Sequence, residues 1–149
     1  MELIRDGKQS RTPHYGRMNM FFYDPKGRKT LPYYDTFPLV LPIERYPDGF
    51  LGINFHYLPM ALRLKLLDRI VDFSNNTKFD ESTIINADYA KLKNIKEIKP
   101  TLKRYLAGRV KTRFRRVDAD EFTVAALLPI ARWKKGTQQD VYRDSRKMI

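Results

Sequence analysis

A run of basic residues is the feature of this sequence with the clearest chemical meaning. Eight of the eighteen residues at positions 99–116 are lysine or arginine, and none is acidic. Cationic side chains at this density bind anionic partners, above all the phosphates of a nucleic-acid backbone. A run of charge can also be an ordinary solvated surface. The arrangement of the charges decides between the two.

The spacing of the apolar residues in this run predicts an amphipathic helix. Six apolar side chains would face the core: Leu102, Tyr105, Leu106, Val110, Phe114 and Val117. The opposite side would carry Arg104, Lys111 and Arg115, with Lys103 and Arg116 at its edges. At 1.5 Å per residue this stripe would be about 16 Å long, which covers several phosphates along one strand.

A second predicted helix, at residues 59–73, offers an internal comparison. Its outward positions carry both signs of charge, with Lys65 and Arg69 balanced by Asp68 and Asp72. Because the chain mixes charges on one helix and not on the other, we interpret the basic run as a surface that binds a polyanion. Within that run, Arg109 and Arg113 would project toward the apolar side. There they would snorkel or pair with acids such as Asp118 or Asp120.

The C-terminal segment, residues 132–149, is also basic. Trp133 lies between Arg132 and the pair Lys134 and Lys135, where an aromatic ring could stack on an end base or on a guanidinium, although packing is the commoner role. These four residues complete the predicted nucleic-acid-binding set. Thr137 and Asp140 have the spacing of a capping signal and predict a short final helix.

Four carboxylates close in sequence raise the possibility of a metal-dependent nuclease: Asp24, Asp35, Glu44 and Asp48. They flank turns or a strand, where such residues commonly have local structural roles. His56 lies in a predicted strand, a setting more typical of a packed histidine than of a general base. The sequence contains no glycine-rich phosphate loop and no nucleophile motif. We therefore predict a binding protein rather than an enzyme, with no catalytic residue, metal ligand or cofactor.

Composition narrows the partner and the compartment. The chain has 149 residues and a net charge of +12, and its pI is about 10.0, which favours DNA, RNA or an anionic membrane surface as partner. It contains no cysteine, which fits a reducing compartment. The uncharged apolar stretch at residues 122–131 is short against the roughly 20 residues that span a bilayer, and the N-terminus has no hydrophobic signal region. We expect a soluble protein that is not exported.

The predicted elements indicate an α+β domain. Residues 1–17 are expected to form a flexible basic arm, and residues 18–149 a single domain with a basic C-terminal tail at 132–149. Strand patterns occur at residues 18–23, 37–43, 50–58 and 122–131, and helical patterns at 59–73, 84–98 and 99–116. This order predicts a small antiparallel sheet that could close into a barrel, with helices packed on one side.

Several strings of the sequence resemble one protein family. They are Met-Phe-Phe-Tyr-Asp-Pro-Lys (20–26), Leu-Pro-Tyr-Tyr-Asp-Thr-Phe-Pro-Leu-Val (31–40), Gly-Phe-Leu-Gly-Ile-Asn-Phe-His-Tyr-Leu-Pro (49–59), Lys-Arg-Tyr-Leu (103–106) and residues 133–146. Together they resemble the DNA end protectors of T4-like bacteriophages, which are head-completion proteins.

The resemblance implies a virion protein that binds the ends of the packaged double-stranded genome. It would shield them from host exonuclease in the host cytoplasm after injection, and would have other virion proteins as partners. Such a role needs affinity without sequence reading, which phosphate contacts supply. The alternative is a structural neck or baseplate component whose basic surface meets an acidic protein surface.

Overall fold

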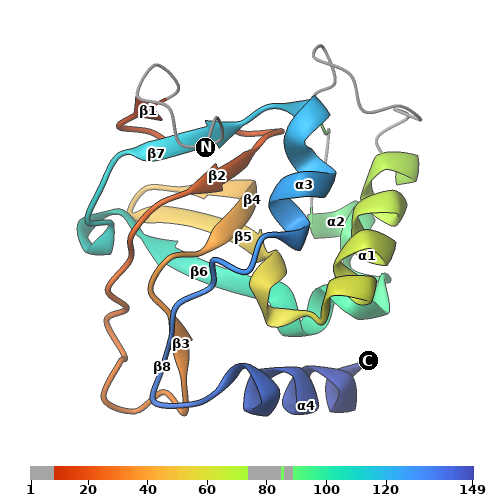
Figure 1. Ribbon diagram of the computed structural model, residues 1–149. Coiled ribbons are helices and arrows are strands. Elements are labelled where there is room, and N and C mark those ends of the chain that lie inside the picture. Colours follow the sequence, from red (N-terminus) through yellow and green to blue (C-terminus); the bar gives the residue numbers. More distant parts are fainter. Residues whose placement is uncertain (1–8, 74–84, 86–88) are drawn as a thin grey trace.

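The computed structural model describes residues 9–73, 85 and 89–149, and its centre is one antiparallel sheet (Figure 1). The strand order is β1-β7-β2-β4-β5-β6, and each neighbouring pair is antiparallel. The strands are β1 (Gln9–Ser10), β2 (Met18–Met20), β4 (Leu39–Tyr46), β5 (Gly49–Asn54), β6 (Leu102–Leu106) and β7 (Phe114–Val117). The predicted α+β class is confirmed, but the sheet is open and does not close into a barrel.

The helices cover one face of this sheet and one end of the molecule. The α-helices are α1 (Met60–Phe73), α2 (Tyr89–Leu92), α3 (Phe122–Leu127) and α4 (Gln138–Met148). The 3-10 turns are η3 (Phe55–Tyr57), η4 (Lys96–Thr101), η5 (Ala107–Arg109) and η6 (Ala119–Glu121). Figure 1 shows α1, α2 and α3 on the same side of the sheet, and α4 beside the small ribbon of β3 (Tyr34–Asp35) and β8 (Trp133–Lys134). Of the helices described, none is long and apolar enough to cross a membrane.

Alternation along the strands gives the sheet two different buried faces. Met18, Met20 and Leu41 belong to the core under the helices. The other face carries a separate cluster, which we call the aromatic cluster because five of its six members are aromatic: Phe21, Tyr23, Val40, Phe50, Tyr105 and Phe114. Successive strand residues point to opposite faces, so one strand can supply both clusters. We call the side with the aromatic cluster the helix-free face.

Several local signals act as predicted. The helix at 59–73 is confirmed, and the Thr137 and Asp140 side chains form the predicted capping box at the start of α4, with hydrogen bonds of 3.1 and 2.9 Å. The proline-containing strand β4 has a shift of register between Pro42 and Glu44. At the hairpin turn, a Cβ on Gly49 would lie 1.9 Å from the Tyr105 carbonyl oxygen, so β5 and β6 can approach only because this residue is glycine.

The predicted helix at residues 99–116 is wrong. This segment forms the end of η4, then β6, η5 and β7. Its aromatic residues lie on paired strands: Tyr105 lies opposite Phe50, and Phe114 lies opposite Ser10. The pairing of β6 with β5, and of β7 with β1 and β2, overrides the helical periodicity, since aromatic residues fit a pleated sheet well. Arg104, Lys111 and Arg115 therefore do not lie along one helical stripe.

Other boundaries also differ from the predictions. Residues 122–127 form α3 rather than a strand, and the strand predicted at 50–58 ends at Asn54 and continues as η3. The strand predicted at 18–23 is confirmed only for Met18–Met20, which form β2 and pair with β4 and β7. Part of the predicted helix at 84–98 lies outside the described residues, and the rest forms α2 and the first turn of η4. Within the predicted arm, Gln9 and Ser10 pair with β7, while residues 1–8 lie outside the described residues.

Candidate nucleic-acid interface

A groove of about 690 Å³ lies on the helix-free face of the sheet. Three parts of the chain line it: residues 11–15, the β4–β5 hairpin, and the segment from Ala107 to Phe114. No acidic residue is among the lining residues. Four exposed basic side chains surround it, and we call it the basic groove after them: Arg11, Arg45, Lys111 and Arg113.

Backbone contacts hold the walls of the basic groove in place. The Lys111 amide donates a hydrogen bond of 2.8 Å to the Phe22 carbonyl, and the Phe22 amide donates one of 3.0 Å to the Thr112 hydroxyl. These reciprocal bonds fix the segment that presents Lys111 and Arg113. On the opposite wall, the Arg45 guanidinium lies over the ring of Tyr15, 4.7 Å from its centroid.

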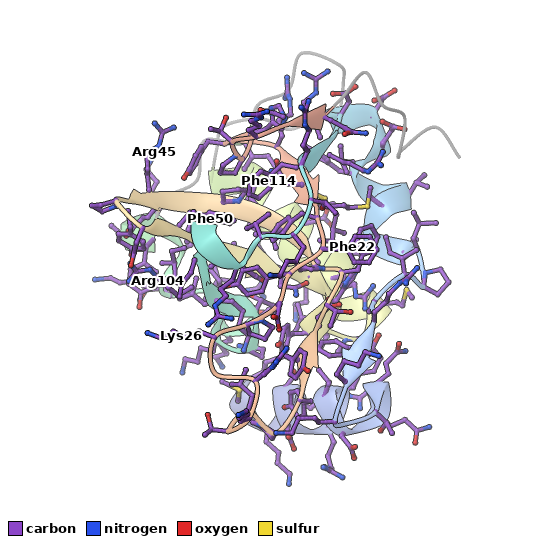
Figure 2. The ribbon with its side chains drawn as sticks, turned by 90° about the vertical axis from the view of Figure 1, so that its left-hand side faces the viewer. Phe22, Lys26, Arg45, Phe50, Arg104 and Phe114 are labelled. Atoms are coloured by element: carbon purple, nitrogen blue, oxygen red, sulfur yellow. The ribbon has the colours of Figure 1, made fainter. Side chains whose placement is uncertain are left out.

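The floor of the basic groove is aromatic. Phe50 and Phe114 both line it, and their ring centroids are 5.8 Å apart in an edge-to-face arrangement. Figure 2 looks onto the helix-free face and shows Arg45 projecting outward from the β4–β5 hairpin, with Phe50 and Phe114 nearer the middle of the face. An apolar floor with cationic walls suits a sugar-phosphate chain, whose sugars are less polar than its phosphates.

The cations of the basic groove differ from other arginines in their partners. Within the described part of the chain, the side chains of Arg11, Lys111 and Arg113 make no hydrogen bond or ion pair, and Arg45 makes only its contact with Tyr15. By contrast, three arginines elsewhere face carboxylates: Arg28 is 3.0 Å from Asp24, Arg116 is 2.8 Å from Asp118, and Arg143 is 3.4 Å from Asp140. The groove cations are thus available to an external anion.

The structure separates the residues that the sequence places on one stripe. Lys111 lines the basic groove, whereas Arg104 on β6 forms an ion pair with Asp48 and stacks on Tyr46 at 4.1 Å. Lys103 points into a different cavity, described below. On β7, Arg115 lines a third cavity of about 590 Å³, and the Arg116 guanidinium donates to Asp118.

The four C-terminal candidates lie on and beside β8, away from the basic groove. The Arg132 guanidinium is 5.3 Å from the Phe22 ring centroid. Trp133 packs edge-to-face on Tyr57, with ring centroids 4.9 Å apart. Lys134 is exposed, and the Lys135 ammonium donates to the carbonyl oxygens of two residues of the 28–29 turn at 3.0 and 3.1 Å. Their role in binding remains a prediction.

Sequence reasoning missed three of the four groove cations. Arg11 and Arg45 lie far from residues 99–116 in the sequence, so no local pattern connects them. Arg113 was expected to project toward the apolar side, but it is exposed and lines the groove. Arg109 was expected to meet Asp118 or Asp120, but it lies 4.0 Å from Asp24. Both corrections follow from the replacement of the expected helix by η5 and β7, which changes the direction of each side chain.

The carboxylates considered for a nuclease site each have a different local partner. Asp24 pairs with Arg28, Asp48 pairs with Arg104, and Glu44 accepts a hydrogen bond of 2.8 Å from the Tyr46 hydroxyl. Among the residues that the structure describes, no three histidine, cysteine or acidic side chains gather as a metal site would require. The geometry therefore gives no support to a metal-dependent nuclease.

Asp35, the fourth carboxylate, belongs to a buried polar network that joins β3, β5 and η3. Its oxygens accept hydrogen bonds from the His56 ring (2.7 Å), the Asn54 amide (3.2 Å), and the backbone amides of Phe37 and Arg132 (both 3.0 Å). Burial disfavours the charged form, but the hydrogen bonds and the His56 charge outweigh it and hold the pKa of Asp35 below its usual value.

Arg63 extends this network into the helices. Arg63 is 1% exposed. Its guanidinium donates to the carbonyl oxygens of Leu58, His56 and Ala126, at 2.7, 3.3 and 2.8 Å, and to the Tyr142 hydroxyl at 2.9 Å. These bonds join η3, α1, α3 and α4. We call the set Asp35, Asn54, His56 and Arg63 the buried network. The hydrogen bonds of Asp35 and Arg63 indicate a structural role, while His56 Nε2 is buried without a hydrogen-bond partner among the described residues.

Comparison with known protein families identifies the relatives of this chain. Residues 2–146 match the family described as Phage T4 terminal DNA protecting protein. The chain belongs to this family. No match was found among curated proteins or among solved structures.

The family match confirms the resemblance drawn from the aromatic and basic strings. It spans nearly the whole chain and includes every residue that lines the basic groove. It also establishes that the chain is a bacteriophage protein of a family concerned with DNA ends. The basic groove, with four cations and no lining carboxylate, is the candidate surface for such a role.

Proposed function

We propose that this member of the terminal DNA protecting family binds the ends of double-stranded phage DNA through its basic groove, without reading sequence, and thereby blocks exonucleases. The observation that carries the proposal is the groove itself: four exposed cations with no carboxylate among the lining residues. A surface whose cations have no carboxylate partner among the described residues attracts the phosphate backbone.

The chemistry of the groove fits binding that ignores sequence. Lysine and arginine contacts to phosphates fix a protein on DNA but carry no base information. A volume of about 690 Å³ is in the range of sites for small ligands rather than for a whole duplex. We infer that the duplex lies across the helix-free face, with the backbone of one strand seated in the groove.

The other predicted residues would extend this surface. Arg104, Arg132 and Lys134 are exposed, and they would contact phosphates beyond the groove. Arg11 would bring the predicted basic arm to the DNA, because it lies next to β1 in sequence and lines the groove. The protein would act in the virion and, after injection, in the host cytoplasm.

An exonuclease protection assay tests the proposal. Linear double-stranded DNA is incubated with the protein and a double-strand exonuclease, with linear or circular DNA as competitor. We expect protection of the linear substrate that linear competitor removes more effectively than circular competitor. Binding should also weaken steeply with salt, with log K falling in proportion to log salt concentration.

The same experiments would recognise a purely structural virion component. Such a protein would sediment with phage particles yet leave linear DNA as sensitive to exonuclease as naked DNA. Absence of binding at 50 mM salt, or binding that does not respond to salt, would contradict the proposal.

A further inference from the structure

A second cavity on the helix-free face has the features of an anion site. Its volume is about 280 Å³, and we call it the tyrosine pocket because five tyrosines line it: Tyr23, Tyr33, Tyr34, Tyr57 and Tyr105. Two basic residues, Lys103 and Arg104, also line it. The volume lies at the lower end of the range for small-ligand sites, so the pocket suits a group of nucleotide size and not a duplex.

Lys103 holds a partly desolvated charge in this pocket. Its ammonium lies 4.0 Å from the Tyr57 ring centroid. Within the described residues it has no hydrogen bond or ion pair. Burial lowers the pKa of Lys103 to about 8. A cation placed like this gains most from a bound anion, because the anion would replace the solvation that the lysine has lost.

The acidic residue in the pocket wall is not a partner for Lys103. Asp35 lines the pocket, but its two oxygens already accept four hydrogen bonds. Two come from side chains of the buried network and two from backbone amides. Two of the tyrosine hydroxyls are also engaged: Tyr33 donates to Asp144 at 2.9 Å, and Tyr23 accepts from the Leu106 amide at 2.8 Å. The walls are thus fixed by their own bonds, while the ammonium remains available.

Arg104 connects the tyrosine pocket to the basic groove. Arg104 is among the residues that line the pocket, and its guanidinium stacks on Tyr46, which lines the groove. The backbone bridge between Tyr23 and Val110 joins the two walls from the other side. Figure 2 shows Arg104 and Arg45 on the same side of the helix-free face. The ring of Tyr105, which lines the pocket, also stacks on that of Phe50, which lines the groove, with centroids 5.3 Å apart, so a strand whose phosphates lie in the groove can reach the pocket.

We propose that the tyrosine pocket receives the 5′-terminal phosphate of a DNA strand, with Lys103 as its cationic partner. The inference rests on the proposed function, since it assumes that the neighbouring phosphates occupy the basic groove. A terminal phosphomonoester carries about −1.5 to −2 charges at pH 7 and has three free oxygens. The phosphodiesters inside a strand lack this second charge. The pocket would thus distinguish an end from the interior of the same DNA.

The test compares two blunt duplexes of identical sequence, one with 5′-phosphates and one with 5′-hydroxyls. Their dissociation constants are measured with the intact protein at fixed salt. We expect the phosphorylated duplex to bind about tenfold more tightly or better, since one hydrogen-bonded charge is at stake. In Lys103→Gln and Lys103→Met this preference should fall to about one, while Lys103→Arg should keep most of it. Lys26→Gln removes an exposed lysine that does not line the pocket, and it should keep the preference.

The outcomes separate this inference from the proposed function. Equal binding of the two duplexes by the wild-type protein would overturn the end pocket and leave binding through the groove intact. Failure to bind either duplex would overturn both. A free deoxynucleoside 5′-monophosphate serves as a further probe. If it binds as tightly as the phosphorylated duplex end, the pocket belongs to free nucleotides and the proposal is wrong.

Discussion

The buried network and the basic groove use charge in opposite ways. In the buried network, Asp35 and Arg63 have their polar atoms met by hydrogen bonds from the surrounding chain. In the basic groove, Arg11, Lys111 and Arg113 face solvent with no such partner among the described residues. Charges that are satisfied internally hold elements together, whereas charges of one sign left unsatisfied at the surface oppose folding by mutual repulsion. The second arrangement is explained by an anionic partner.

The comparison predicts that Asp35→Ala acts on stability. The substitution leaves the buried His56 ring, the Asn54 amide and two backbone amides without their acceptor. Loss of one member of a buried pair typically costs about 3 to 5 kcal/mol of unfolding free energy. Urea denaturation followed by circular dichroism measures the change.

A pH series and a matched control sharpen this prediction. The pKa of Asp35 is lowered in the folded protein, so its stabilisation is complete above the unfolded-state pKa near 3.9 and is lost as pH falls through the folded-state pKa. The difference between wild type and Asp35→Ala should therefore shrink in acid. The control Asp24→Ala removes a partly exposed carboxylate and should cost less than about 1 kcal/mol. If the two variants lost the same free energy of unfolding, the buried network would contribute no more to stability than an exposed ion pair.

Removal of the groove cations should act on DNA binding. The triple variant Arg45→Ala, Lys111→Ala, Arg113→Ala should reduce the slope of log K against log salt by about 0.9 for every phosphate that the variant no longer neutralises. If all three contacts are lost, the slope falls by about 2.7, which at 0.1 M salt corresponds to a loss of affinity of about 500-fold relative to 1 M salt. Fluorescence anisotropy with a labelled duplex, repeated at several salt concentrations, gives both quantities.

A second triple variant removes the same charge elsewhere. Lys93, Arg143 and Lys147 are exposed and do not line the groove. Alanine at these positions lowers the net charge equally, so a general charge effect would reduce affinity in both variants. We expect a much smaller loss and a nearly unchanged salt slope. Equal losses would mean that net charge, and not the basic groove, determines affinity.

Lys103 in the tyrosine pocket shares a feature with each of the two regions: it is half-buried, and it has no anionic partner among the described residues. Raising the pH from 7 to 9 should reduce the preference for a 5′-phosphate by up to about tenfold, as Lys103 loses its proton near pH 8. A bound phosphate would move this transition upward. Dissociation constants measured at several pH values for the two duplexes give the profile.

The neighbouring groups should not titrate in that window. Tyr33, whose pKa is raised to about 12 chiefly by burial, and Tyr57, whose pKa is raised further by burial, stay neutral. Burial also raises the pKa values of Tyr23 and Tyr105. Asp35 stays charged, and the Lys103→Arg variant should have a flat profile because arginine keeps its proton throughout this range. A wild-type preference that does not change between pH 7 and 9 would remove Lys103 from phosphate recognition.

The same contrast explains which features could be predicted from the sequence. Residues 59–73 and the capping box of Thr137 and Asp140 depend on neighbours within one or two turns of helix, so local pattern sufficed. Residues 99–116 carry a helical periodicity, but their structure depends on pairing with Phe50 and with β1 and β2, which are remote in sequence. The family was recognised because its strings are contiguous in the sequence. The basic groove could not be predicted from the sequence, because Arg11 and Arg45 lie near Lys111 only in the folded chain.

The smallest expected effect concerns Arg104. Like the groove cations it is exposed, but like the charges of the buried network it has a partner, Asp48. Asp48→Asn keeps the shape of the turn and removes the carboxylate charge. An exposed pair of this kind contributes about 0 to 1 kcal/mol, so the free energy of unfolding should change little. Duplex affinity should rise a few-fold and the salt slope should steepen by up to about 0.9, because the guanidinium becomes available to a phosphate. If Asp48→Asn leaves binding unchanged while Arg104→Ala weakens it, the ion pair positions Arg104 for DNA. If neither variant changes binding, Arg104 does not contact DNA, and the path from the basic groove to the tyrosine pocket does not pass along its side chain.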